Sequence, residues 1–415
     1  MDISLDIENL ICPITQEIFK DPVVADDQII YERDAIEDWL LKNDISPITR
    51  HRISNILIST NFIKNLVNIA LCKYPELKEL QYKISDIERI KVFINTGRYD
   101  SIKKYKNFDL LSLRKNDVIN TLVDKKQIDV LKYILDNATS LEDTIEKRKI
   151  IHVMAKHKSD VLTKYLIDKN VDLECEDESK WRPIHFVCRY LSEDMIKYII
   201  DKGVNLECET NNGWRPIHFI CRYSTANMIK YIIDKGVNLN CETKNKLMPI
   251  HLICEYSNSD MIKYIIDKGV NLECETELKS KPIHLICQYS TPEMIKYIID
   301  KNVDIESQNM KGWAPIHLIC RNSTPEMIKY IIDKNVNLEI QTNDGWTPLH
   351  IICRYSNVET IKYIINKKVN MELRIKKYND QDYDFNYIDL LERNEQIDED
   401  ELDNLMIELT NIIKE

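Results

Sequence analysis

The sequence repeats itself at an interval of 33 residues. The stretch WRPIHFVCRY, which begins at Trp181, returns as WRPIHFICRY at Trp214, and a Pro-(Ile/Leu)-His triplet marks every copy. Six copies are in register, with their prolines at Pro183, Pro216, Pro249, Pro282, Pro315 and Pro348. A fixed period of this length predicts stacked units, each of which buries its apolar face against its neighbours. The chain is therefore expected to form an array rather than one globular core.

Each copy contains the local signals of two short helices. Proline opens the first helix, where its missing N–H leaves no bond unmade. Preferred N-cap residues open the second helix. They are Ser192, Thr225, Asn258, Thr291, Thr324 and Asn357. Glycine or asparagine, which accept the left-handed conformation after a helix, end it. These terminators are Gly203, Gly236, Gly269, Asn302 and Asn335.

This unit of one turn and two helices resembles the ankyrin repeat. The tetrapeptide Thr-Pro-Leu-His at residues 347–350 matches the family pattern in full, so the Thr-to-His hydrogen bond of the family is expected only there. Earlier units are more divergent and include IIHVMAK around His152 and VLKYILDN near residues 130–137. The resemblance covers roughly residues 85–375. The tandem IIDKGVNLE units are most similar to the ankyrin-repeat proteins of giant DNA viruses.

The cysteines are predicted to be reduced thiols. Most of the twelve recur at the repeat interval, in one column of six and another of four. Equivalent residues of stacked helical units lie about 8–10 Å apart, whereas a disulfide needs Cα atoms within about 7 Å. The thiols then act as small apolar side chains, and the expected location is the cytoplasm. The resemblance to viral proteins implies that this is the cytoplasm of a host cell.

The repeated histidines are predicted to pack rather than to bind metal. His185 and Cys188 are three residues apart, a spacing that suits zinc, but the same pair recurs in every unit without a second pair of ligands. Identical residues at each level also indicate scaffolding rather than one active site. We expect no catalytic residue, no metal and no cofactor.

Two columns of the array are predicted to bind a target protein, because Trp and Arg are enriched at interface hot spots. The columns are Trp181, Trp214, Trp313 and Trp346, and Arg189, Arg222, Arg321 and Arg354. Both are interrupted in the middle repeats, where Leu247 and Ser280 replace Trp. The alternative is structural: each Trp covers the neighbouring turn, and each Arg binds carbonyl groups at a helix end.

The period does not reach the first seventy residues. That segment predicts a loop, a hairpin in PVVADDQIIY that turns near Asp26-Asp27, an amphipathic helix from Glu32 to Lys42, a second loop SPITR, and a helix from Phe62 to Leu71. Only Cys12 and His51 are zinc ligands by residue type, which is too few for a zinc-bound RING finger.

This segment resembles the U-box, the zinc-free relative of the RING finger. The matching residues are Cys12-Pro13-Ile14-Thr15, Asp21-Pro22-Val23, Tyr31-Glu32-Arg33, Ile36, Trp39-Leu40, Pro47-Ile48-Thr49-Arg50 and Asn61. The resemblance implies that polar side chains brace the loops in place of zinc. The expected braces are Glu32, Arg33, Asp34, Thr49 and Asn61. Gln28 stands where the family usually has Gly, so an altered hairpin turn is expected.

The U-box resemblance also implies a function. U-boxes bind ubiquitin-charged conjugating enzymes (E2s) and promote transfer of ubiquitin to a lysine without a covalent intermediate of their own. By position, Ile14 and Pro47 are expected to form the groove for the E2, with Trp39 as its floor. Arg50 is expected to hold ubiquitin and the E2 together, which orients the thioester for attack. Each of these residues also has a structural alternative in the core, in a turn or in a surface ion pair.

The predicted architecture is mostly α: a small α+β U-box domain followed by an α-solenoid of ankyrin repeats. The expected parts are a U-box at 5–73, a linker with degenerate capping repeats at 74–149, the repeat solenoid at 150–375, and a capping segment at 376–415. In the last part, a polar, turn-prone stretch precedes a helix with an apolar stripe.

The predicted function is that of a U-box E3 ubiquitin-protein ligase, with an E2, ubiquitin and an unknown target protein as partners. The alternative is a non-catalytic scaffold whose U-box is inactive. Nucleic acid is not an expected partner, because the net charge is −11 and phosphate contacts need clustered cations. A membrane is not expected either, because no apolar run approaches the roughly 20 residues of a membrane helix.

Overall fold

A computed structural model describes residues 7–81, 86–144, 148–334, 336–367, 375–378, 381–385 and 387–414. The chain forms two compact units, Met1–Asp172 and Leu173–Glu415. Helices dominate both units, and the strands are few and short, as the sequence predicts. Among these ranges, no helix has the length and apolar character needed to cross a membrane. The finer part boundaries expected from the sequence stay a prediction.

The first unit begins with a small α+β domain, residues 7–81. Its helices are α1 (Arg33–Leu40), α2 (Asn61–Lys73) and the short 3-10 helices η1 (Ile7–Leu10) and η2 (Pro75–Leu80). Its three strands, β1 (Pro22–Val24), β2 (Ile30–Glu32) and β3 (Ile58–Ser59), form an antiparallel sheet in the order β2-β1-β3. The predicted hairpin and both predicted helices are confirmed. The sequence did not predict β3, because two residues show no alternating pattern.

The hairpin turn closes tightly around Gln28. This residue takes the left-handed conformation, with φ of 62°, and its N–H donates to the carbonyl oxygen of Ala25 over 2.9 Å. The Asp27 carboxylate accepts from the N–H of Ile29 over 3.1 Å. A non-glycine residue in this conformation costs about 1 kcal/mol. The turn therefore keeps a geometry suited to glycine, at some cost in stability.

Tyr31 and Ile36 lie at the centre of this domain and are fully buried. They pack with Cys12, Phe19 and other apolar residues from the loops, the sheet and α2 in one cluster. Burying such side chains contributes roughly 1.5–3 kcal/mol each. The core thus joins both loops to the sheet and to α1.

Short helices continue the first unit after the small domain. They are α3 (Asp86–Asn95), α4 (Tyr99–Ile102), α5 (Leu110–Lys115), α6 (Val118–Asp124), α7 (Ile128–Asp136), α8 (Ile150–Lys156) and α9 (Asp160–Asp168). The divergent phrases VLKYILDN and IIHVMAK fall on α7 and α8, as expected of decayed repeats. The part expected at 74–149 as linker and capping repeats begins with η2, and residues 82–85 lie outside the described residues.

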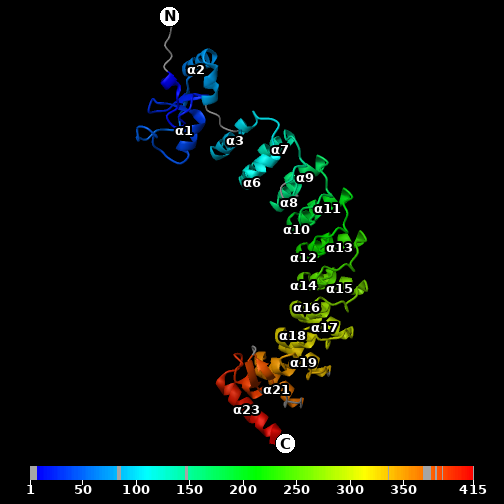
Figure 1. Ribbon diagram of the computed structural model, residues 1–415. Coiled ribbons are helices and arrows are strands. Elements are labelled where there is room, and N and C mark those ends of the chain that lie inside the picture. Colours follow the sequence, from blue (N-terminus) through cyan, green and yellow to red (C-terminus); the bar gives the residue numbers. More distant parts are fainter. Residues whose placement is uncertain are drawn as a thin grey trace. The chain divides into compact units, whose positions relative to one another are not determined.

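The second unit is a stack of helix pairs (Figure 1). The first helices of the pairs are α10 (Pro183–Tyr190), α12 (Pro216–Tyr223), α14 (Pro249–Tyr256), α16 (Pro282–Tyr289), α18 (Pro315–Asn322) and α20 (Pro348–Tyr355). The second helices are α11 (Glu193–Asp201), α13 (Ala226–Asp234), α15 (Ser259–Asp267), α17 (Pro292–Asp300), α19 (Pro325–Asp333) and α21 (Val358–Asn366). Each first helix begins at the predicted proline and packs against the first helix of the next pair.

Both predicted helix signals are confirmed. The Ser192 hydroxyl accepts from the N–H of Met195 over 3.3 Å, and the other five N-cap residues make the equivalent bond. Gly203 has φ of 81° and Asn302 φ of 57°, the left-handed conformation that ends the second helix. Asn335, expected to do the same, lies outside the described residues.

The repeated histidines join each pair to the next. The Nδ1 atom of His185 accepts from the N–H of Arg182 over 2.9 Å, so its Nε2 carries the proton and donates to the carbonyl oxygen of Cys208 at 3.1 Å. Burial lowers the pKa of His185 and of His218 to about 4, because the charged form loses its water. Neutral histidine is thus a structural group here, which confirms the packing role.

The last full repeat also makes the predicted Thr-to-His bond, with Thr347 Oγ1 at 2.8 Å from His350 Nδ1. The cysteine columns are free thiols, all buried except the half-buried Cys274, and burial raises the pKa of Cys208 to about 11. No group of three or more His, Cys, Asp or Glu that suits a metal ion occurs among the described residues.

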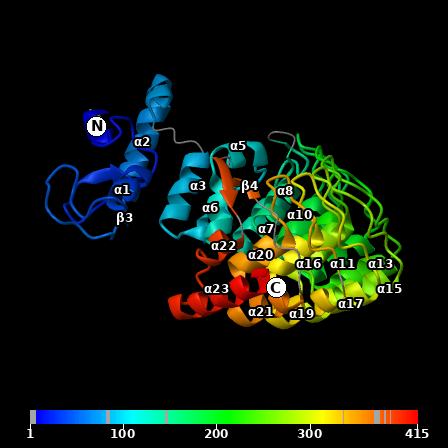
Figure 2. The same ribbon diagram turned by 90° about the horizontal axis from the view of Figure 1, so that it is seen from below.

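A C-terminal segment covers the last repeat. Its helices are α22 (Tyr387–Leu391) and α23 (Glu399–Lys414). The Tyr387 ring stacks on His350 with 4.4 Å between centroids, and the Asn394 side chain donates to the carbonyl oxygens of Cys353 and Ser356, each over 2.8 Å. Figure 2 shows α23 beside α21, which it contacts. The predicted capping helix is confirmed; of its predicted stripe, Leu405 is buried.

The polar stretch before this cap differs from the prediction. Instead of turns alone, it contains an antiparallel hairpin of β4 (Ile375–Tyr378) and β5 (Gln381–Phe385). Its sequence, IKKYNDQDYDF, lacks the regular apolar alternation from which a strand is predicted.

Candidate functional site

Two loops of the small N-terminal domain are hydrogen-bonded to neighbouring residues of strand β2. In the first loop, Cys12 Sγ accepts from the N–H of Glu32 over 3.2 Å. In the second, Ser46 Oγ lies 3.3 Å from the hydroxyl of Tyr31. Since Tyr31 donates to the Asp27 carboxylate over 2.7 Å, Ser46 is the donor to Tyr31. Strand β2 therefore sets the position of both loops.

The second loop is held from inside by Ser46, which is fully buried. Its Oγ accepts from the N–H groups of Ile48 and Thr49 over 3.1 and 2.9 Å, and its own N–H donates to the carbonyl oxygen of His51 over 2.8 Å. The indole N–H of Trp39 adds a bond of 2.7 Å to the carbonyl oxygen of Ile45. These hydrogen bonds hold the loop in position, which is the role of a metal ion in a RING finger.

The strand after the first loop is held by Glu32. Its buried carboxylate accepts from the N–H groups of Lys20 and Asp21 over 2.7 and 3.1 Å. Burial raises the pKa of Glu32, because the charged carboxylate loses water that these two bonds only partly replace. Next to it, Arg33 Nε donates to the Asp21 carboxylate over 2.7 Å.

The predicted braces are therefore only partly the observed ones. Glu32 and Arg33 brace the domain as expected. Asp34 instead binds Arg89 of α3 over 2.9 Å, the hydroxyl of Thr49 is buried without a partner among the described residues, and Asn61 is exposed. The sequence did not predict that Ser46, Tyr31 and Asp27 brace the domain. These residues form no recognisable pattern in the sequence and come into contact only in the folded domain.

The residues expected to bind an E2 lie in or beside these two loops. Ile14 and Pro47 are half-buried, and Ile14 packs on the domain core. Trp39 is also half-buried, and its N–H is used within the domain. Ile48, not singled out from the sequence, is 49% exposed and adds apolar surface beside Pro47. The two loops thus present apolar side chains on a rigid frame.

Arg50 is the cation of the second loop. It is exposed, has φ of 63°, and makes no side-chain hydrogen bond or ion pair with the described residues. Its guanidinium keeps all its donors for another molecule. The surface can therefore bind and orient a partner.

The predicted target-binding columns of the array contact each other. The Arg189 guanidinium lies over the Trp181 ring at 5.5 Å, and Arg222 lies over Trp214 at 5.9 Å. Arg321 and Trp313 repeat this contact at 5.8 Å. The structural alternative of helix-end carbonyls applies to Arg354, which donates to the carbonyl oxygen of Arg393, and Trp346 lies half-buried in its own column.

A third column was missed from the sequence. Tyrosines at the ends of the first helices are widely exposed, and their exposed fractions are 48% at Tyr223, 47% at Tyr256, 54% at Tyr289 and 41% at Tyr355. The Arg222 guanidinium lies between the rings of Tyr223 and Tyr256, at 5.5 and 5.2 Å. Their position in the 33-residue period was visible, but an aromatic residue ending an apolar helix is easily assigned to the core.

Comparisons with known proteins agree with both parts of this description. The repeat architecture defines a class of proteins built from stacked helix pairs. The model of ankyrin repeats (3 copies) matches residues 119–210, 202–276, 224–309 and 283–375, more than half of the 415 residues, so the chain belongs to the ankyrin-repeat family. The model of the U-box domain matches residues 7–68, so a U-box precedes the repeats.

Three curated relatives match this chain over 55 to 75 residues. The chain is 47% identical over 55 residues to "WD repeat, SAM and U-box domain-containing protein 1" of Danio rerio, which covers 13% of this chain and 11% of that protein. It is 43% identical over 75 residues to "Putative E3 ubiquitin-protein ligase LIN" of Medicago truncatula, covering 17% and 5%. It is 39% identical over 64 residues to "E3 ubiquitin-protein ligase PUB23" of Arabidopsis thaliana, covering 15% and 16%.

The chain thus spans at most 16% of the length of these three relatives. Among solved structures, it is similar to the human ASB11 ankyrin repeat domain, with 18% identity and a TM-score of 0.44, over 54% of this chain and 99% of that one.

Proposed function

We propose that this protein is a U-box E3 ubiquitin-protein ligase. The observation that carries the proposal is the pair of loops around Ile14 and Pro47, which presents apolar side chains and a free cation, Arg50, on a frame braced without metal. Two of the curated relatives are named "Putative E3 ubiquitin-protein ligase LIN" and "E3 ubiquitin-protein ligase PUB23". Apolar anchors on a rigid support are what a stable docking site requires.

In this proposal, the E2 binds Ile14, Pro47 and the neighbouring Ile48, while Trp39 supports them from α1. Arg50 donates to ubiquitin and the E2 together and so restricts the thioester to orientations open to attack. The lysine nucleophile and the thioester both come from other proteins. The U-box therefore accelerates transfer by orientation, without any bond to ubiquitin.

The ankyrin repeats hold the target protein in this proposal. The support is the exposed face on which arginine, tryptophan and tyrosine stack, as at Arg222, Trp214 and Tyr256. Rings and guanidinium groups fixed by their neighbours lose little freedom on binding, which favours them as contact residues. Replacing Trp214 and Arg222 by Ala is expected to weaken target capture while leaving E2 binding unchanged.

The proposed setting is the cytoplasm of a host cell infected by a giant DNA virus. It is supported by the free, buried cysteines and by the tandem IIDKGVNLE units of the sequence. Immunofluorescence of the tagged protein in infected cells tests it, and an extracellular or purely nuclear signal would contradict it.

Autoubiquitination with a broad panel of E2s tests the enzymatic proposal. The wild-type chain is expected to form ubiquitin conjugates with at least one E2, and Ile14→Ala or Pro47→Ala to abolish them. Ile56→Ala is the matched control, because Ile56 is 66% exposed in the same domain but lies outside both loops. If the folded wild type forms no conjugates with any E2, the alternative of an inactive U-box on a binding scaffold stands instead.

A further inference from the structure

A hollow lies in the first compact unit, where the small domain meets helices α3 and α4. Its volume is about 590 Å³. That is within the range of roughly 300–1,000 Å³ typical of small-ligand sites. None of the residues expected to bind an E2 lines it.

The lining of this hollow, here called the junction pocket, is strongly cationic. It contains Lys20, Arg33, Lys64, Arg89, Arg98 and Lys104. Only two carboxylates line it as well, Asp21 and Asp34, and Glu37 beside the pocket pairs with Arg98, which leaves an excess of three positive charges. The whole chain has a net charge of −11, so this concentration of cations is local and opposite in sign to the rest. Such a pocket attracts anions from solution.

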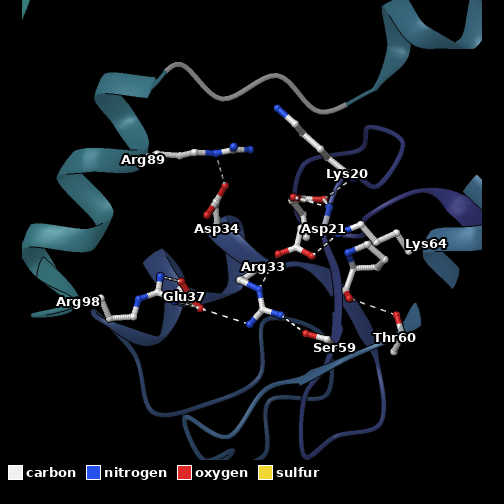
Figure 3. Close-up of polar contacts among 12 residues, drawn as sticks. Lys20, Asp21, Arg33, Asp34, Glu37, Ser59, Thr60, Lys64, Arg89 and Arg98 are labelled. Carbon is white, nitrogen blue, oxygen red and sulfur yellow. Dashed lines mark hydrogen bonds and ion pairs between the residues drawn. The ribbon is translucent and has the colours of Figure 1, made fainter. Parts of the chain in front are cut away.

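Ion pairs fix the floor of the junction pocket. Arg89 Nε donates to the Asp34 carboxylate over 2.9 Å, and Asp34 is only 7% exposed (Figure 3). Arg98 of the adjoining segment binds Glu37 through both terminal nitrogens. On the other side, Arg33 is paired with Asp21. The three guanidinium groups are therefore held in place before any ligand arrives.

The three lysines keep donors for a ligand. Lys20 and Lys104 are exposed, and neither ammonium group has a hydrogen bond or ion pair with the described residues. Lys64 makes one long contact of 3.4 Å to Asp21, so part of its ammonium group is free as well. Each ammonium group has three N–H donors and no acceptor. Lys20 and Lys64 come from the small domain and Lys104 follows α4, so an anion that reaches all three joins the two parts.

From this arrangement we propose that the junction pocket binds a small polyphosphate and that the bound ligand fastens the U-box to the first helices of the array. Several phosphate groups on one molecule match the excess of three charges better than a single carboxylate does. A bounded hollow in an otherwise acidic chain favours a small molecule over a nucleic-acid strand. An inositol polyphosphate and a nucleoside triphosphate share the required chemistry.

Isothermal titration of the full chain in phosphate-free buffer tests the proposal. The probes are myo-inositol hexakisphosphate, ATP without magnesium, and inorganic phosphate. Saturable 1:1 binding of at least one polyphosphate is expected, with at least tenfold weaker binding of inorganic phosphate. The probe that binds more tightly identifies the source of the phosphate groups. The proposal is overturned if neither polyphosphate saturates at about 1 mM, the weakest affinity that a specific small-ligand site of this kind would have.

A pair of matched variants locates the site. Lys20→Gln with Lys104→Gln is expected to weaken polyphosphate binding at least tenfold, since it removes two free ammonium groups from the pocket. Lys115→Gln with Lys156→Gln removes the same charge from exposed positions outside the pocket and is expected to change binding less than twofold. Equal losses in the two variants, or no loss in the first, would overturn the assignment. All these lysines are exposed, and an unchanged melting temperature without ligand checks that each variant is folded.

Hydrogen exchange of the same samples tests the fastening directly. Bound polyphosphate is expected to slow exchange together at residues 19–21 of the small domain and at residues 101–105, which include the end of α4 and the turn after it. Protection confined to one of these segments contradicts a bridging ligand. Because no E2 takes part, failure here leaves the ligase proposal untouched, and failure of the ligase proposal leaves this result interpretable.

Discussion

The U-box and the ankyrin array solve the problem of buried polar groups in different ways. In the U-box, the bracing side chains each make their own individual bonds: Ser46 holds one loop, and Glu32 holds the strand after the other. In the array, one bond recurs, in which a neutral histidine such as His185 links each helix pair to the next. The U-box is therefore expected to be sensitive to single substitutions. The array is expected to be sensitive to pH, because a change of pH acts on all its histidines at once.

Acid is expected to have the largest effect, and on the array. The folded-state pKa of His185 and of His218 is lowered to about 4, so the folded array binds fewer protons than the unfolded chain between about pH 6.5 and 4. The contribution of these histidines to the stability of the array is complete above pH 6.5 and is lost as the pH falls toward 4. The loss is up to about 3 kcal/mol for each of these histidines, at about 1.4 kcal/mol per pKa unit.

Tryptophan fluorescence measures this transition. Of the five tryptophans, only Trp39 lies outside the array, so a Trp39→Phe variant reports on the repeats alone. His185→Gln with His218→Gln is expected to shift the acid midpoint, whereas His51→Gln, an exposed histidine of the U-box, is not. An unchanged midpoint in the first variant would show that the histidines do not set the acid response.

In the U-box, Glu32→Ala is expected to have the next largest effect. It leaves the N–H groups of Lys20 and Asp21 without their acceptor in the interior, at a cost of roughly 2–4 kcal/mol of unfolding free energy. Limited proteolysis of the full chain, followed by the rate of cleavage within residues 7–81, measures the loss. Glu17→Ala, at an exposed position, is the control. Comparable protection of both variants would contradict the role assigned to Glu32. Its raised pKa also means that ionisation of this carboxyl costs stability, so the contribution of Glu32 grows as the pH falls, opposite in sign to that of the histidines.

A smaller effect of opposite sign is expected at the hairpin. Gln28→Gly relieves the left-handed conformation of a side-chain-bearing residue and is expected to stabilise the U-box by about 1 kcal/mol. The entropy that glycine adds to the unfolded chain opposes part of this gain. Urea denaturation followed by the Trp39 signal measures the difference. A destabilised Gln28→Gly variant would mean that the glutamine side chain contributes more than its backbone conformation costs.

The smallest expected effect lies on the surface of the array. The Tyr297 hydroxyl donates to the Asp267 carboxylate of the preceding repeat over 2.9 Å, at a largely exposed position. Tyr297→Phe removes this bond but keeps the ring beside Lys263 and is expected to cost about 0.5 kcal/mol. Thermal unfolding measures it. A loss above about 2 kcal/mol would show that the array, like the U-box, depends on individual bonds.

The sequence predicts the array well because its signals are local. Pro183 and the N-cap Ser192 act within one turn of the helix that each begins, and repetition multiplies the evidence. It predicts the U-box braces only in part, because Ser46 and Tyr31 are 15 residues apart and a serine in a loop carries no distinctive pattern. The bond between Asp34 and Arg89 spans 55 residues, so no sequence window contains it. The candidate E2 residues came from family resemblance, and their geometry came from the structure.

Single-turnover discharge of ubiquitin from a charged E2 to free lysine is the most direct test of the central claim, that the U-box orients an E2. The wild-type chain is expected to accelerate discharge, and Arg50→Ala to slow it by roughly tenfold or more while E2 binding persists, since Arg50 acts on orientation. Arg52→Ala, at an exposed cation two residues away that is paired with Asp44 over 2.9 Å, is expected to leave the rate unchanged. No acceleration by the folded wild type with any E2, or equal effects of the two arginine variants, would contradict the claim.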